Sequence, residues 1–157
     1  MTADAPTHYD YIVIDSSPAF TDVVLEAFDT SDVHVLLTTL DIPTIKNMRV
    51  SISTMDELEL PRSKRILVVN HSDLVTGVGI DDVERSLGMP VSIRIPSSAG
   101  VPTSINQGVT LVQSDPKHPV IKAILELAAM ITGRDKEEET KSKRSIFPAR
   151  KAKVTAS

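Results

Sequence analysis

Short apolar segments of this 157-residue chain end in polar residues that could bind a ligand. The segment 11–15 ends in Asp15, whose carboxylate could order a water on Mg²⁺, because that ion prefers oxygen ligands and keeps several waters. A later segment ends in Asn70, whose amide offers the paired donor and acceptor that could bind a purine edge. Another such segment ends in Pro96, and Ser97 follows it. These residue types favour a ligand site.

Each of these residues also has a purely structural interpretation. Asp15 could cap a helix that begins near Pro18, and Asn70 could be a turn residue that tolerates left-handed geometry. Asp41 follows a further apolar segment and is better explained as a helix cap than as a ligand. One polar strand end alone would favour the structural interpretation, whereas four together favour a site.

The elements that must position these residues are strands that alternate with helices. Four segments rich in β-forming residues are expected to be strands, at 11–15, 33–39, 65–70 and 91–96. Three of them lack polar alternation, as strands covered on both faces do. Strands alternating with helices predict an α/β fold with three layers and a mostly parallel sheet. Ligands of such sheets bind beyond the carboxyl ends of the strands, where the polar residues lie.

Apolar residues at helical spacing predict the helices between and after these strands. We expect stripes at the following positions: Phe20, Val23, Val24, Ala27 and Phe28; Ile45, Met48, Ile52 and Met55; Ile80, Val83 and Leu87; Val120, Ile121, Ile124, Leu125, Ala128 and Ile131. Asp41 and Pro43 are expected to begin the second helix, and Gly88 to end the third. Asp115 and Pro116 are expected to open the last helix.

Composition and charge exclude several classes of protein. The chain has no cysteine, so it has neither disulfides nor thiolate metal sites. No apolar segment approaches the roughly 20 residues that span a bilayer, and no signal-peptide pattern is present, so we expect a cytoplasmic protein. Residues 1–133 hold 9 basic and 17 acidic residues, which argues against nucleic-acid binding. Residues 134–157 hold 8 basic and 4 acidic residues and are expected to form a disordered tail after a single domain, 1–133.

Other catalytic patterns are missing from the sequence. There is no GxSxG to place a serine nucleophile, and neither GxxxxGK[ST] nor GxGxxG to bind phosphates. The four histidines (8, 34, 71 and 118) are scattered without the spacing of metal ligands. Asp15 therefore stands without the phosphate-binding loop that would normally accompany it.

The order of segments resembles the C-terminal two-thirds of proteins of the MinD/ParA family of P-loop ATPases. Within that family, the resemblance is strongest to the pilus-assembly branch, CpaE/TadZ. The resemblance covers 9–132 and is carried by "YDYIVIDSSPAF", "DVHVLLTTLDIPTIKNMR", "RILVVNHSD", and "NQGV" followed by "SDPKHPV". It departs from the family at Ser17, where relatives often have proline, and at His71, where an arginine is common. The P-loop and the switch I acid of the family lie upstream of the matched part. We therefore expect the N-terminal part of the domain to be missing.

The resemblance implies roles for the residues named above. The position of Asp15 belongs to switch II (the Walker B strand end) and helps position Mg²⁺ and the attacking water, while Asn70, Pro96 and Ser97 match residues that lie against adenine. ATP and Mg²⁺ are the cofactors of the intact family, and we expect weak or no binding by this chain alone. The implied partners are a second copy of the protein and pilus or secretion proteins at the membrane.

Three functions remain open from the sequence. The resemblance implies a CpaE/TadZ-like pilus-assembly or localisation factor with no ATP hydrolysis of its own. The alternatives are a MinD/ParA-like protein of bacterial cell division or chromosome partition, and a non-enzymatic α/β interaction module. The basic residues of 141–157, around Ile146 and Phe147, permit weak peripheral binding at the inner face of the cell membrane. Pro148 and the preceding acidic residues oppose it, and a solvated tail is expected.

Overall fold

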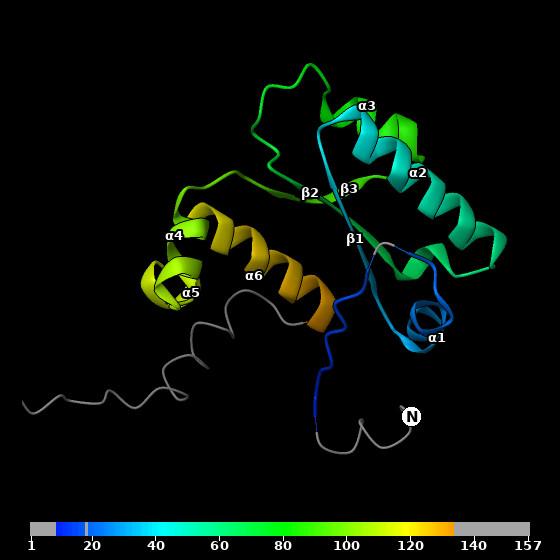
Figure 1. Cartoon of the computed structure of the whole chain (residues 1–157), viewed down its shortest axis with the longest axis horizontal. Coiled ribbons are helices and arrows are strands. Elements are labelled where there is room, and N and C mark those ends of the chain that lie inside the picture. Colours follow the sequence, from blue (N-terminus) through cyan, green and yellow to red (C-terminus); the bar gives the residue numbers. More distant parts are fainter. Residues whose placement is uncertain (1–8, 18, 134–157) are drawn as a thin grey trace, which may run out of the picture.

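The computed structural model describes residues 9–17 and 19–133 as an α/β fold (Figure 1). Helices and strands alternate along most of the chain. In chain order the elements are α1 (Asp22–Thr30), β1 (His34–Thr39), α2 (Ile42–Glu57), the 3₁₀ helix η2 (Arg62–Lys64), β2 (Arg65–Asn70), α3 (Ile80–Leu87), β3 (Val91–Ile95), α4 (Gly100–Gln107), α5 (Leu111–Ser114) and α6 (Pro119–Thr132). The predicted charged tail and most of the predicted domain's first ten residues lie outside the described residues.

The sheet has three parallel strands in the order β1-β2-β3, as the alternation of elements predicts. His34 pairs with Arg65, and the register continues without a shift to Thr39 and Asn70. Pairing between β2 and β3 shifts at Leu67 and Val68, and ends with Asn70 opposite Ile95. The carboxyl ends of the three strands therefore lie along one edge of the sheet.

One face of the sheet is covered by α2 and α3, and this side holds the main core (Figure 1). The stripe predicted for α2 points inward, with Met55 fully buried and Ile45 and Ile52 nearly so. The stripe of α3 does the same through Val83 and Leu87. The buried core contains no aromatic side chain and consists of Leu36, Leu40, Ile45, Ile52, Met55, Leu60, Leu67, Val69, Val83 and Leu87. Burial of these apolar side chains supplies most of the stabilisation on this face.

The opposite face is covered by α6, which makes the third layer. Ala123 of α6 packs with Val68 of β2 and Ile93 of β3. Val120 and Ile121 are buried as predicted, whereas Ile124 and Ile131 are exposed. Helix α6 thus covers only part of this face.

Several helix ends agree with the sequence and one does not. Asp41 caps α2, since its carboxylate accepts a hydrogen bond from the Thr44 N–H at 2.9 Å, and Pro43 lies in the first turn. Gly88 ends α3 with φ of 65°, a left-handed conformation that favours glycine. The last helix does not open at Asp115 and Pro116, because His118 is its N-cap.

The predicted strand 11–15 is wrong: this segment is not part of the sheet. Ile12, Val13 and Ile14 are exposed at 54%, 94% and 51%. A strand is held by hydrogen bonds to a neighbour, and among residues 9–17 and 19–133 the sheet consists of β1, β2 and β3 without this segment. Asp15 does not cap a helix either, because Thr21 is the N-cap of α1.

Within the part of the chain that the structure describes, no helix combines the length and apolar character needed to cross a lipid bilayer. The expected membrane-binding segment, 141–157, lies outside the described residues.

Candidate functional site

The site lies where β2 and β3 end. Asn70 is the last residue of β2, and its register partner, Ile95, is the last residue of β3. Pro96 and Ser97 follow at once, so the structure brings the three predicted base-binding residues to neighbouring strand ends. All three are half-buried.

Hydrogen bonds join the turn after β2 to the loop after β3. The backbone N–H of Ser97 donates to the Asp73 carboxylate at 2.6 Å, and the Ser97 hydroxyl lies 3.1 Å from Nδ1 of His71. The Ser72 N–H donates to the Ile95 carbonyl at 3.0 Å. Hydrogen bonds from Ser97, the backbone one above all, lower the pKa of Asp73 below its ordinary value. The acceptor is therefore ionised at neutral pH, which strengthens the connection between the two segments.

His71 has a left-handed backbone, with φ of 51°. Such geometry costs a residue with a Cβ about 1–2 kcal/mol, and it is seen mainly in Asn, Asp, His and Gly. The His71 N–H donates to Oδ1 of Asn70 at 3.0 Å, so that oxygen is engaged by the backbone. The Asn70 amide N–H groups are the donors that could reach a ligand. The structural interpretation of Asn70 would require a left-handed backbone at Asn70. The left-handed residue in this turn is His71 instead.

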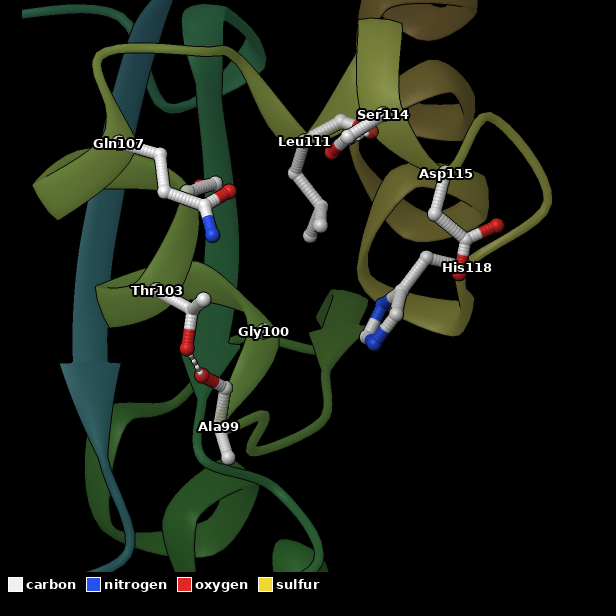
Figure 2. A pocket seen from close by; sticks show the side chains of 9 residues that line it. Ala99, Gly100, Thr103, Gln107, Leu111, Ser114, Asp115 and His118 are labelled. Atoms are coloured by element: carbon white, nitrogen blue, oxygen red, sulfur yellow. Dashed lines mark hydrogen bonds between the residues drawn. The ribbon is translucent and has the colours of Figure 1, made fainter.

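A hollow of about 370 Å³ opens on the other side of the same loop (Figure 2). Its walls come from α4, α5 and the N-terminal end of α6, and are lined by Ala99, Gly100, Thr103, Ser104, Gln107, Leu111, Ser114, Asp115 and His118. Figure 2 shows Thr103 and Gln107 on one wall and Asp115 and His118 on the other. The surface of the hollow is more apolar than polar, and Leu111 is its largest aliphatic side chain.

The nearby pair Ser98 and His118 resembles a nucleophile with its base, but the hydrogen bonds exclude that role. Nδ1 of His118 accepts from the Val120 N–H at 3.2 Å, which places the proton of the neutral ring on Nε2. Nε2 then donates to the Ser98 hydroxyl oxygen at 3.0 Å, and that oxygen also accepts from the Gly100 N–H at 2.9 Å. His118 therefore cannot take the Ser98 proton in this arrangement. The pair holds the loop against α6.

Two of the candidates that the sequence offered make none of the hydrogen bonds described above between the turn after β2 and the loop after β3. Asp15 is exposed, in the segment that is not part of the sheet, and its role at Mg²⁺ stays a prediction. Asp41 lies at the end of β1, where a hydrogen bond from the Thr39 hydroxyl and the bond from Thr44 lower its pKa. These bonds engage both carboxylate oxygens of Asp41, in agreement with its interpretation as a cap.

The described residues alone do not supply enough ligands to hold a magnesium ion. Residues 9–17 and 19–133 contain no group of three or more His, Asp or Glu side chains that could hold a metal. Asp15 could contribute at most one carboxylate, through water. Further ligands would have to come from phosphates or from other polypeptide.

Sequence reasoning predicts Asn70, Pro96 and Ser97 as base-binding residues, but it missed the residues that hydrogen-bond to Ser97 and hold its loop in place. Asp73 and Ser97 are 24 positions apart, and Ser98 and His118 are 20 apart, so no local pattern connects them. The available signal was the polar run Asn-His-Ser-Asp directly after β2, at the edge where parallel sheets bind ligands.

Comparison with solved structures identifies the fold. The chain is similar to a ParA family ATPase from Chlorobium tepidum TLS, with 25% identity and a TM-score of 0.73 over 79% of this chain and 52% of that one. It is similar to the MinC:MinD cell division protein complex of Aquifex aeolicus, with 19% identity and a TM-score of 0.69 over 83% and 55%. It is also similar to the MinD cell division protein of Aquifex aeolicus, with 17% identity and a TM-score of 0.59 over 69% of this chain and 47% of that one.

The chain therefore has a MinD/ParA-like fold and spans about half the length of these proteins. No protein-family model and no curated protein matches the sequence.

Proposed function

We propose that this chain forms the base-binding part of a MinD/ParA-type ATPase fold and serves as a pilus-assembly or localisation factor of the CpaE/TadZ kind. The base-binding role rests on the hydrogen bonds that join the turn after β2 to the loop after β3. Both segments lie at the edge where open parallel sheets bind nucleotides, in a fold similar to a ParA family ATPase.

Adenine binding would use groups that the turn and the loop already hold in place. The Asn70 amide donors can bind an acceptor nitrogen of the base, and the Pro96 ring offers an apolar contact for its face. Asp73 and His71 act as positioning residues, because their hydrogen bonds to Ser97 fix the loop relative to Asn70. Mg²⁺ and the phosphates of ATP would require the phosphate-binding loop, which these 157 residues lack.

Adenosine binding tests this assignment. Most affinity for ATP comes from phosphate contacts, so we expect a Kd above about 1 mM, which corresponds to roughly −4 kcal/mol. Chemical-shift mapping should place adenosine at residues 70–73 and 95–98, and Asn70→Ala should abolish the shifts. Asn47→Ala, on the exposed side of α2, is the matched control. Shifts that map elsewhere, or that survive Asn70→Ala, would refute the base site.

Hydrolysis is a separate question, because it depends on groups that stabilise the transferring phosphoryl. In this fold they are backbone N–H groups of a glycine-rich loop and a lysine, and the sequence contains no such loop. We expect ATP turnover by this chain to equal that of a protein-free blank. Turnover that disappears in Asp15→Ala would show that the chain has a substitute phosphate site.

The pilus role rests on the resemblance of the quoted segments to the CpaE/TadZ branch. Deleting the gene from its own organism should reduce surface pili while cell length and chromosome number stay normal. Neighbouring genes for pilins and a secretion ATPase would support the same conclusion. Loss of pili that a plasmid copy of the gene does not restore would count against it.

A second candidate function is a part in cell division or chromosome partition. It is favoured by the solved structures, since one of them is a ParA family ATPase and two contain a MinD cell division protein. The deletion strain separates the two roles, because filamentous or anucleate cells with normal pili would support this candidate. If adenosine does not bind and neither phenotype appears, a non-enzymatic interaction module is the remaining interpretation.

A further inference from the structure

One histidine ring connects the start of α6 to the loop after β3. Nδ1 of His118 accepts the Val120 N–H at 3.2 Å, and Nε2 donates to the Ser98 hydroxyl oxygen at 3.0 Å. Both nitrogens belong to one rigid ring, so a rotation that takes Nδ1 away from Val120 also takes Nε2 away from Ser98. The helix cap and the contact with the loop therefore form and break together.

The first residue of α4, Gly100, packs against the same ring. The Gly100 N–H donates to the Ser98 hydroxyl oxygen at 2.9 Å. A Cβ built on Gly100 would lie 3.1 Å from that oxygen and 3.6 Å from Nε2 of His118. The ring therefore holds the loop at the point where α4 begins. All of these groups follow β3, which lies at the opposite edge of the sheet from β1.

Only a neutral His118 ring fits this arrangement. Nδ1 can accept a hydrogen bond only without a proton, whereas a protonated imidazole carries an N–H on both nitrogens. A proton on Nδ1 would point at the Val120 N–H and would place a positive charge at the N-terminus of α6, where the helix dipole disfavours it. Protonation therefore removes the cap and drives the ring away from its present position.

The charged groups around His118 do not reverse this preference. Asp115 lines the same hollow (Figure 2) and would attract a charged ring, while its Oδ1 accepts the Lys117 N–H at 3.3 Å. Lys117 precedes His118 and Lys122 lies one turn after it on α6, so both repel an added positive charge. Helices α4 and α5 and residues 96–99 carry no charged side chain. Hydrogen bonding therefore decides which form of the ring fits.

We propose that His118 is a pH-dependent latch, whose neutral ring holds the loop after β3 against α6 and whose protonation releases that loop. The latched state binds one proton fewer than the released state, so a falling pH favours release. Histidine ordinarily changes charge between about pH 5 and pH 8, so we expect release at mildly acidic pH. The loop also carries Ser97, so release would loosen one side of the base site. That consequence rests on the proposed function, whereas the latch itself does not.

Nuclear magnetic resonance on the natural chain tests the latch directly. At about pH 7.5 the nitrogen shifts of the His118 ring should show the proton on Nε2. As the pH falls from there to about 5, protection of the Val120 and Gly100 amides from hydrogen exchange should decrease with the midpoint of the ring titration. We expect a decrease of about fivefold at Val120, the size of a lost helix cap. A proton on Nδ1 at the higher pH, or protection that does not follow the ring, would overturn the proposal.

The variant His118→Ser separates the helix cap from the contact with the loop. Serine is a favoured N-cap, but it has no group that titrates in this range and no ring to reach Ser98. The Val120 amide should stay protected at both pH values. The Gly100 amide should exchange at both as fast as it does in the acidified natural chain. Gly100 protection that still changes with pH in this variant would assign the change to another group and refute the latch.

The matched control is His71→Asn, because His71 is the histidine that faces the loop from the turn after β2, with its Nδ1 3.1 Å from the Ser97 hydroxyl. Asparagine tolerates the left-handed backbone of this position. The Val120 and Gly100 amides should lose protection as they do in the natural chain, and a transition that disappears here would belong to His71 and contradict the proposal. Protection of core amides of β2 shows that each variant is folded. No nucleotide is added, so these outcomes are independent of the base site.

Discussion

The guanidinium of Arg65, at the start of β2, donates from Nη1 to Oδ1 of Asp56 at 2.7 Å. The Arg65 side chain is only 1% exposed, and its Nη2 donates to the Leu60 carbonyl at 2.6 Å. The exposed Arg62 binds the same carboxylate, at 2.5 Å. Asp56 thus connects the C-terminal end of α2 to the first residue of β2.

Replacing Asp56 should therefore destabilise the fold. Asp56→Asn leaves the buried Arg65 charge without its anionic partner, and a buried unpaired charge is costly. We expect a lower Tm at pH 7 than for the natural chain. Glu57→Gln, at the next and exposed position, should leave the Tm unchanged. Equal Tm values for the two variants would show that the ion pair contributes nothing.

The contribution of Asp56 should also depend on pH. Hydrogen bonds from Arg62 and then Arg65 lower its pKa from 3.8 to about 2. The sign follows from linkage: a lowered carboxyl pKa stabilises the folded state above pH 3.8, and this contribution is lost as pH falls towards 2. The stability difference between the natural chain and Asp56→Asn, measured in urea, should shrink below about pH 4. A difference that stays constant from pH 6 to pH 3 would contradict this.

Asp73 should control the loop after β3. Its pKa is lowered mainly by the Ser97 backbone N–H, so the Ser97 amide resonance should titrate with a midpoint below 3.8. Asp73→Ala should speed hydrogen exchange at the Ser97 amide, because that N–H loses its acceptor. Exchange at core amides of β2 serves as the internal reference. A midpoint at or above 3.8 would mean that this hydrogen bond does not persist in solution.

Met55 should be a major contributor to core stability. It is fully buried in α2 against the main core, and large-to-Ala changes at such positions cost about 2–5 kcal/mol. Met130→Ala makes the same chemical change at a side chain that is 50% exposed, where we expect about 0.5 kcal/mol or less. Urea unfolding measures both. A small decrease in the free energy of unfolding for Met55→Ala would mean that the core rearranges to fill the cavity that the substitution leaves.

Gly88 should be sensitive to any side chain for conformational reasons alone. Its φ is 65°, and a Cβ built there would meet no heavy atom within 4 Å. Gly88→Ala should therefore cost about 1 kcal/mol through backbone strain without a steric clash. Gly88→Asn should cost less, because asparagine tolerates the left-handed region. Equal losses in urea unfolding would indicate a cause other than backbone conformation.

The sequence predicts the elements whose signals are local. The strands that end at Thr39 and Asn70 follow from apolar segments without polar alternation, the strand that ends at Ile95 follows from its β-forming residues, and α2 follows from Asp41 and Pro43. Asn70 and Ser97 are predicted as site residues because they lie at or directly after the carboxyl ends of strands in a parallel sheet.

Features that depend on distant partners could not be predicted in the same way. Residues 11–15 have strand composition, but a strand also requires pairing with a neighbour, which composition alone does not predict. The start of α6 at His118 also depends on tertiary contacts, since the ring that caps the helix donates to Ser98. The hydrogen bond from Ser97 to Asp73 joins two loops that only the folded sheet brings together.

The parallel register has a consequence for the order of events during synthesis. His34 pairs with Arg65, 31 positions later in the chain. At about 5–20 residues per second, the ribosome needs roughly 2–6 s to make the segment between them. Of the three sheet strands, β1 is synthesised first, and it has apolar side chains on both of its faces. During this interval no other strand of the described sheet is available to pair with it. Of the sheet strands, we expect β1 to be the one that a chaperone binds on the nascent chain.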